Sequence, residues 1–220
     1  MTFSRALLAA LTAAALLPAG ASAGRDVAAF YYPWYGTHEL DGAYHHWGQN
    51  GRAAPFEIAS NFFPARGAYS SGDPRILDAQ MAEMAAAGIR TVVTTWWGWG
   101  SLEDQRLPAV LRAANRRGVS VAVHLEPYGG RTLATIEQDI AHLKTLGIRD
   151  VYVYRPSDIP ADGWAALRPS LRDVRLFAQT NLVGFAAAGR FDGVYSYDIL
   201  LFDGDFFGRY CAQARRARLL

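Results

Sequence analysis

Apolar runs alternate with helical patterns along most of the chain. Several of the runs are almost continuously apolar and β-branched, which is typical of strands that are buried on both faces of a parallel sheet. We expect six such strands, at Val27–Tyr32, Ile89–Thr95, Val119–Leu125, Val151–Tyr154, Val174–Ala178 and Gly193–Tyr197.

The segments between the strands have helical spacing and recognisable ends. Asp73 can cap a helix that has Pro74 at its first position, and Thr132 opens another helix. A further helix is expected to begin at Pro108. The remaining helices are expected at Trp164–Leu167, at Leu182–Ala188 and from about Phe206 towards the C-terminus.

Alternating strands and helices predict an α/β fold with a parallel sheet, either doubly wound or closed into a barrel. The glycine-rich motifs of nucleotide-binding folds are missing from the sequence. Polar and aromatic clusters follow the strands at their carboxyl ends, where barrel enzymes place their active sites. We therefore predict a (β/α) TIM-type barrel that is incomplete, with about six of eight β–α units. Its sixth strand is expected to be an open edge, and the final segment reads as a continuing helix.

The N-terminus has the form of an export signal. Arg5 precedes an apolar stretch at Ala6–Leu17, and Ala21-Ser22-Ala23 is suitable for signal peptidase cleavage. The stretch is shorter than the roughly 20 residues needed to span a bilayer. A buried N-terminal helix is the alternative interpretation. We predict a signal peptide at residues 1–23, a barrel domain at residues 24–220, and a secreted protein, either extracellular or periplasmic.

Charge and cysteine content narrow the classes of partner. The net charge is +2, and it falls to +1 once the predicted leader with Arg5 is removed. This value favours neither nucleic acid nor a membrane surface as a partner. Cys211 is the only cysteine in the sequence, so no disulfide can form within the chain.

Aromatic and hydrogen-bonding residues gather after the strands and form the predicted sugar-binding site. The six tryptophans lie in or beside predicted loops, although either Trp96 or Trp97 is expected to fill the barrel interior. Strand alternation puts His124 and Glu126 on one face, with Arg131 able to neutralise or orient the carboxylate. A structural salt bridge between Glu126 and Arg131 is the alternative. The predicted substrate-binding residues are Tyr32, Trp34, Tyr35, Tyr44, His46, Trp47, Trp97, Trp99, His124, Glu126, Tyr128, Arg131, Tyr154, Arg155, Tyr197 and Asp198.

Metal and cofactor binding are not predicted. His45 and His46 are adjacent, so on an extended chain they point to opposite sides, and no cysteine or carboxylate spacing supports a metal site. Hydrogen bonding of one histidine to sugar hydroxyls, beside a stacking tryptophan, explains this pair better.

The motifs together resemble glycoside hydrolase family 99. The resemblance is carried, in order along the chain, by Phe-Tyr-Tyr-Pro-Trp-Tyr-Gly, Tyr-His-His-Trp, Thr-Trp-Trp-Gly, His-Leu-Glu-Pro-Tyr-Gly-Gly-Arg and Phe-Asp-Gly-Val-Tyr-Ser-Tyr-Asp. It covers Val27 to Leu220. The family contains endo-α-1,2-mannosidases and mannanases, so the resemblance implies a barrel fold and a mannose-containing oligosaccharide or polysaccharide as partner.

The resemblance also implies a mechanism. The family cleaves internal α-mannosidic linkages with retention and without an essential metal. One glutamate deprotonates the substrate's own 2-hydroxyl to form a 1,2-anhydro sugar, and a second acts as general acid, unlike the usual carboxylate attack. The family carries both glutamates in an Asn-Glu-Trp-x-Glu-Gly element, which this sequence lacks. Because Glu126 matches a different family position, no catalytic residue is assigned, and the chain alone is expected to be inactive.

Three functions remain open on these grounds. The first is an endo-α-mannosidase represented by its N-terminal portion. The second is a non-catalytic secreted carbohydrate-binding protein on the same scaffold. The third is an unrelated parallel α/β binding protein.

Overall fold

The computed structural model describes residues 27–220, so the predicted signal peptide at residues 1–23 lies outside the described part of the chain. Six strands form one sheet in the order β1-β2-β3-β4-β5-β6, and every neighbouring pair is parallel. They are β1 (Val27–Tyr31), β2 (Ile89–Trp96), β3 (Ser120–Leu125), β4 (Asp150–Val153), β5 (Arg175–Gln179) and β6 (Gly193–Tyr195). The six predicted strands are confirmed, with ends that differ by one or two residues.

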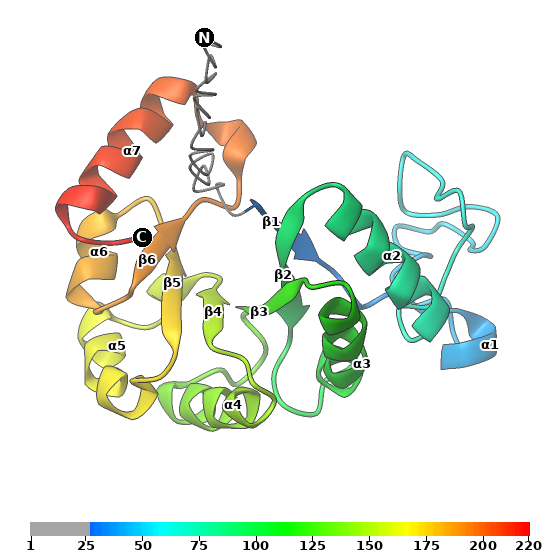
Figure 1. Cartoon of the computed structure of the whole chain (residues 1–220), viewed down its shortest axis with the longest axis horizontal. Helices are drawn as coiled ribbons and strands as arrows, with labels where there is room; N and C mark the ends of the chain where they lie inside the picture. Colours follow the sequence, from blue (N-terminus) through cyan, green and yellow to red (C-terminus); the bar gives the residue numbers. More distant parts are fainter. Residues whose placement is uncertain (1–26) are drawn as a thin grey trace, which may run out of the picture.

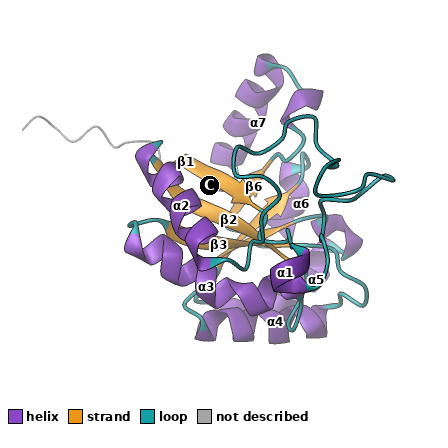
Figure 2. Ribbon diagram, turned by 90° about the vertical axis from the view of Figure 1, so that its right-hand side faces the viewer, coloured by secondary structure: helices purple, strands orange, loops and turns teal. Residues whose placement is uncertain are grey.

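The sheet curls, and the helices cover its outer side (Figure 1). The same arrangement is visible from the side, where helices surround the stacked strands (Figure 2). A single parallel sheet whose strands follow in sequence order, with a helix after each, is the topology of a (β/α)-barrel. The predicted fold, an incomplete barrel of six units, is confirmed.

The main core lies between the sheet and the helices. Every second strand residue faces this layer, because side chains alternate between the two faces of a strand. Val92, Val123, Val151 and Leu176 are fully buried there, each on a different strand. Burial of such a side chain contributes about 1.5–3 kcal/mol, so this layer supplies much of the stability.

The alternate strand residues fill the barrel interior with aromatic rings. Phe30 of β1 lies with its ring centroid 4.9 Å from that of His124 in β3 and 6.0 Å from that of Tyr195 in β6. Tyr152 of β4 stacks on Phe177 of β5 at 4.6 Å. The two edge strands therefore meet through side chains across the interior.

Two helices begin as the sequence predicts. In α2 (Pro74–Ala86), the Asp73 carboxylate accepts a hydrogen bond from the amide of Arg75. In α4 (Leu133–Thr145), Thr132 and Thr135 form a reciprocal capping box. Both arrangements satisfy amides that the first helical turn leaves without partners. A short helix, α1 (His38–Asp41), lies in the long connection before α2.

The predicted start of the next helix at Pro108 is wrong. Helix α3 spans Leu102–Arg116 and is capped by Ser101, whose side chain accepts from the amide of Asp104. Pro108 lies inside this helix. Proline removes one helical hydrogen bond at a cost of about 3 kcal/mol. The Ser101 cap, two acidic residues in the first turn and a buried apolar face offset that cost.

The last three helices are α5 (Ala161–Leu167), α6 (Val183–Ala188) and α7 (Gly204–Arg216). The expected continuing helix at the end of the chain is wrong, because Arg218 adopts a left-handed φ of 59° and stops it. The chain then turns beside β6. The Leu220 amide donates to the Asp192 carbonyl at 2.9 Å, and its carbonyl accepts from the amide of Val194 at 3.1 Å. These two bonds follow a parallel ladder and partly cover the expected open edge.

Candidate functional site

A row of stacked aromatic side chains crosses the carboxyl end of the sheet. The hydroxyls of Tyr32 and Tyr197 hydrogen-bond to each other, joining the segments that follow β1 and β6. Tyr32 stacks on Trp34 with ring centroids 4.7 Å apart, and Trp34 stacks on His46 at 4.5 Å with an interplanar angle of 8°. Four residues of the predicted site thus form one continuous row of rings.

The end of this row is set by local backbone geometry. His46 has a φ of 59°, in the left-handed region, and this conformation turns its ring over Trp34. Burial lowers the pKa of His46, and the positive charges of His45 and Arg106 lower it further. The imidazole is therefore neutral at neutral pH, and it stacks as an uncharged ring.

A buried guanidinium clamps the loop that carries the row. Arg106 of α3 donates to the carbonyls of Pro33 (2.7 Å) and Tyr35 (3.0 Å) and to Asp41 Oδ1 (2.5 Å). Burial opposes ionisation of Asp41. Hydrogen bonds from Ser70, the Thr37 amide and Arg106 outweigh that cost and hold its pKa below the usual value.

Beneath the row, one carboxylate projects into the barrel from the end of β3. Glu126 is 6% exposed, and its Oε1 accepts from Thr95 Oγ1 at 2.6 Å and lies 2.8 Å from His124 Nδ1. His124 Nε2 lies 2.8 Å from the hydroxyl of Tyr195. The His124 and Glu126 pair, predicted from strand alternation to share one face, is brought together by the structure.

The site continues along β4 and β6. The Tyr154 ring lies 5.4 Å from His124 and 5.2 Å from Tyr197, so it joins the same aromatic wall. Burial raises the pKa of Tyr154, and the nearby Asp198 adds to this shift. Asp198 and Arg155 are exposed at the rim, and Arg155 pairs with Asp158 at 3.1 Å.

The three tryptophans after β2 have separate environments. Trp96 is completely buried, but between β2 and the helices, where its Nε1 donates to Asp104 Oδ1 at 3.0 Å. The prediction that Trp96 or Trp97 fills the barrel interior is wrong for Trp96, and Trp97 is 39% exposed. Trp99 stacks on His142 of α4 at 4.5 Å, away from the row. A single apolar strand has two buried faces, and the sequence does not distinguish them.

Trp47 and Tyr35 pack inside the loop that carries the row, where Tyr35 lies edge-on to Trp34. Trp47 is 4% exposed, its Nε1 donates to the Tyr69 carbonyl at 2.8 Å, and its ring lies 4.2 Å from that of Tyr35. A buried indole with a satisfied N–H packs as a core side chain. The structure therefore places Trp47 in the frame of the loop, although the sequence predicts it as a sugar-binding residue. Tyr44 is half-buried in the same loop.

Arg131 and Tyr128 are also bound within the protein. Arg131 donates to the carbonyls of Tyr154 and Arg155, each at 2.8 Å, and to Asp158, so the alternative interpretation, a structural salt bridge between Glu126 and Arg131, is wrong. The Tyr128 hydroxyl donates to Asp139 of α4. Burial and this hydrogen bond raise the pKa of Tyr128 to about 12. Both residues fix the loops after β3 and β4.

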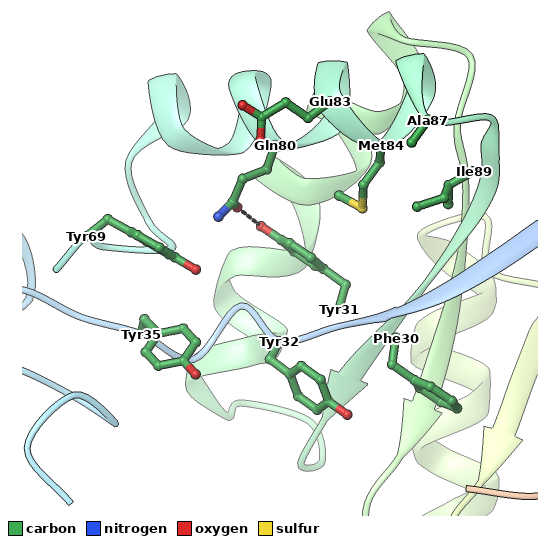
Figure 3. A pocket seen from close by; sticks show the side chains of 10 residues that line it. All are labelled: Phe30, Tyr31, Tyr32, Tyr35, Tyr69, Gln80, Glu83, Met84, Ala87 and Ile89. Carbon is green, nitrogen blue, oxygen red and sulfur yellow. Dashed lines mark hydrogen bonds between the residues drawn. The ribbon is translucent and has the colours of Figure 1, made fainter. Parts of the chain in front are cut away.

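A pocket of about 390 Å³ lies on the other side of β1 (Figure 3). Tyr31 points towards α2, where its hydroxyl donates to Gln80 Oε1 at 2.8 Å, whereas Phe30 and Tyr32 point away from that helix. Met84 and Ile89 complete its apolar wall. The pocket thus shares Tyr32 and Tyr35 with the predicted site, but it opens beside the edge of the sheet.

Residues 27–220 show neither a metal-binding cluster nor a membrane-spanning helix. Within that range no group of three or more His, Cys, Asp or Glu side chains is placed to hold a metal ion. No helix of the same range is both long and apolar enough to cross a bilayer.

Sequence reasoning missed four residues that build the site. Thr95 and Tyr195 contact the His124 and Glu126 pair, and Arg106 and Asp41 hold the aromatic loop. Alternation along β2 and β6 could have identified Thr95 and Tyr195, because they lie two residues before Trp97 and Tyr197. Arg106 had no such signal, because the expected helix start at Pro108 left it in a loop.

The curled parallel sheet and the site at its carboxyl end define a (β/α)-barrel protein with its functional face in the usual place. The family model described as glycosyl hydrolase family 99 matches residues 24–160, more than half of the chain. The chain belongs to glycosyl hydrolase family 99.

Similar proteins agree with this assignment. A zebrafish (Danio rerio) glycoprotein endo-alpha-1,2-mannosidase-like protein is 30% identical over 78% of this chain and 50% of its own length. A mouse (Mus musculus) glycoprotein endo-alpha-1,2-mannosidase is 31% identical over 52% of this chain and 30% of its own length. The chain therefore spans half or less of these relatives.

A solved structure shows the same fold. The family 99 endo-alpha-mannosidase from Bacteroides thetaiotaomicron superposes with a TM-score of 0.78 at 24% identity. The match covers 88% of this chain and 69% of that chain.

Proposed function

We propose that this chain forms the glycan-recognition part of an endo-α-mannosidase site and binds internal α-linked mannose residues of an oligosaccharide or polysaccharide. The observation that carries the proposal is the link between the Glu126 carboxylate and the row of rings: Glu126 bonds His124, whose ring stacks on Tyr197, and Tyr32, Trp34 and His46 follow in the row. Aromatic faces stack on the apolar faces of sugar rings, and a carboxylate accepts hydrogen bonds from hydroxyls. The choice of mannose as the sugar rests on the names of the relatives, which are endo-alpha-1,2-mannosidases or proteins like them.

The proposal extends to the reaction. Cleavage with retention through the 1,2-anhydro sugar requires the glutamate pair that the family carries in its Asn-Glu-Trp-x-Glu-Gly element. The sequence lacks that element. We therefore infer that these 220 residues bind the glycan without hydrolysing it, and that the protein is exported by its N-terminal signal.

A direct test is calorimetric titration of the purified chain with α-1,2-mannobiose and with yeast α-mannan. Maltose serves as the control disaccharide. Glu126→Gln should weaken mannoside binding about tenfold or more, because hydrogen bonds to charged groups are worth about 1.5–3 kcal/mol. Glu137→Gln removes an equal charge from the exposed surface of α4 and should leave binding unchanged.

Two results would contradict the proposal. Absence of heat with mannosides, or equal affinity for maltose, would exclude α-mannoside recognition. Release of oligosaccharides from α-mannan by this chain alone would show that it carries its own catalytic groups. The signal peptide is tested by expressing the full chain in bacteria and determining the N-terminal residue of the exported product, which should be Gly24.

A further inference from the structure

The Glu126 carboxylate is held asymmetrically. Among the described residues, both of its hydrogen-bonding partners reach Oε1, from Thr95 Oγ1 at 2.6 Å and from His124 Nδ1 at 2.8 Å. Oε2 receives no hydrogen bond from residues 27–220. Oε2 is not among the buried side-chain atoms that lack a partner in this part of the chain, so it is open to the barrel mouth and can accept a hydrogen bond from a group that enters there.

The imidazole that holds Oε1 is itself fixed on two sides. Its ring stacks on Tyr197 with centroids 5.4 Å apart and an interplanar angle of 11°, and the edge of Phe30 approaches at 4.9 Å. The side chain of His124 is 1% exposed. The ring therefore has little freedom to rotate away from Glu126.

The accepting oxygen of Glu126 sets the direction of the hydrogen bonds, and Tyr195 completes them. Burial raises the pKa of Tyr195 far above the neutral range, so its hydroxyl keeps its proton. That hydroxyl lies 2.8 Å from His124 Nε2 and can donate to it. Oε1 of Glu126 accepts, so the neighbouring Nδ1 carries the imidazole proton and donates a hydrogen bond to it, and Nε2 is left to accept from Tyr195. The chain of donors runs from Tyr195 through His124 to Glu126.

We propose that Thr95, His124 and Tyr195 are positioning residues that occupy Oε1 of Glu126 and present Oε2 to a hydroxyl of the bound sugar. This inference rests on the proposed function and specifies which atom performs the recognition. An ionised oxygen accepts but does not donate, so the ligand must supply an O–H at this point. A deoxy or O-methyl sugar that lacks this O–H leaves Oε2 unpaired and is rejected.

The matched pair Thr95→Val and Thr95→Ser tests the arrangement by titration with α-1,2-mannobiose. Valine is nearly isosteric with threonine but has no hydroxyl, so affinity should fall about tenfold, equivalent to about 1.4 kcal/mol. Serine keeps the donor and should stay within about twofold of the unmodified chain. In a Glu126→Gln background, Thr95→Val should have little further effect, because the two groups act as one unit. Equal affinity of the valine and serine variants would overturn the proposal.

A second readout does not need the ligand. Imidazole nitrogen-15 spectra should show His124 as the Nδ1–H tautomer, and Tyr195→Phe should shift that equilibrium. Tyr152→Phe removes a hydroxyl from the same interior and should leave the tautomer unchanged. An Nε2–H tautomer, or no response to Tyr195→Phe, would overturn the positioning role. Failure of the unmodified chain to bind mannoside, with the tautomer as expected, would instead count against the proposed function.

Discussion

Replacing Arg106 by methionine should cost about 3–5 kcal/mol of folding free energy. The substitution keeps an aliphatic stem in a site where the guanidinium side chain is 7% exposed, and it removes every donor. Breaking a buried ion pair at one partner costs about 3–5 kcal/mol, because the other charge stays buried. Two carbonyls, of Pro33 and Tyr35, also lose their donor. Asp41 keeps the amide of Thr37 at 2.8 Å, which limits the loss.

Urea unfolding followed by far-ultraviolet circular dichroism measures this cost. Domains of this size have a total stability of about 5–15 kcal/mol, so the variant should still fold at low temperature. Arg112→Met is the matched control, because Arg112 is exposed on the same helix. The double variant Asp41→Asn with Arg106→Met should lose at least about 1 kcal/mol less than the two single losses added together. Hydrogen exchange should accelerate at the Thr37 and Asp41 amides, which belong to the clamped loop.

Two outcomes would refute the claim that Arg106 holds the aromatic loop in place. If Arg106→Met and Arg112→Met unfold within about 1 kcal/mol of each other, Arg106 does not hold the loop against the barrel. Additive losses in the double variant would likewise show that Asp41 and Arg106 act independently.

Three further predictions concern separate parts of the chain. In a nuclear magnetic resonance titration, the pKa of His46 should lie below about 6.5, so the stability of the fold declines as the pH falls through that value. Trp34→Ala should raise the pKa of His46 because it exposes the ring, and an unchanged pKa would contradict the stack. Gly193→Ala should lower the melting temperature, because a Cβ would lie 2.6 Å from Phe177 Cδ1 and 2.9 Å from the Leu220 carbonyl, and an unchanged melting temperature would argue against this packing. Ser101→Ala should cost about 1 kcal/mol in urea unfolding by removing the cap of α3, and a helix that truly began at Pro108 would show no loss.

The strands could be predicted from the sequence because of how the barrel is filled. Val92 and Val123 face the helices, and aromatic residues such as Phe30 face the interior, so both faces of each strand are apolar. In the sequence, a strand of this kind appears as a continuous run of apolar residues. The start of α3 at Leu102 was missed because proline is common at the first position of a helix, and Pro108 is an exception whose cost the rest of α3 offsets.

The sequence predicts the residue types of the site, but not which of them face a ligand and which pack against the rest of the protein. Alternation along one strand pairs His124 with Glu126, and the structure confirms that they meet. Whether an aromatic or charged side chain faces a ligand or a neighbouring loop depends on contacts across the fold. Trp47 and Arg131 are of residue types that sugar sites use, yet their side-chain N–H groups donate to backbone carbonyls distant in the sequence.

The hydrogen bond between Tyr32 and Tyr197 also has a mechanical meaning. These tyrosines follow the first and last strands of the sheet, so the distance between them sums the twist of five successive strand pairings. A ligand that contacts both hydroxyls therefore senses the curvature of the whole sheet. By linkage, any change that flattens the sheet, even at β3 or β4 and far from the sugar, weakens binding by the free energy needed to restore the curl.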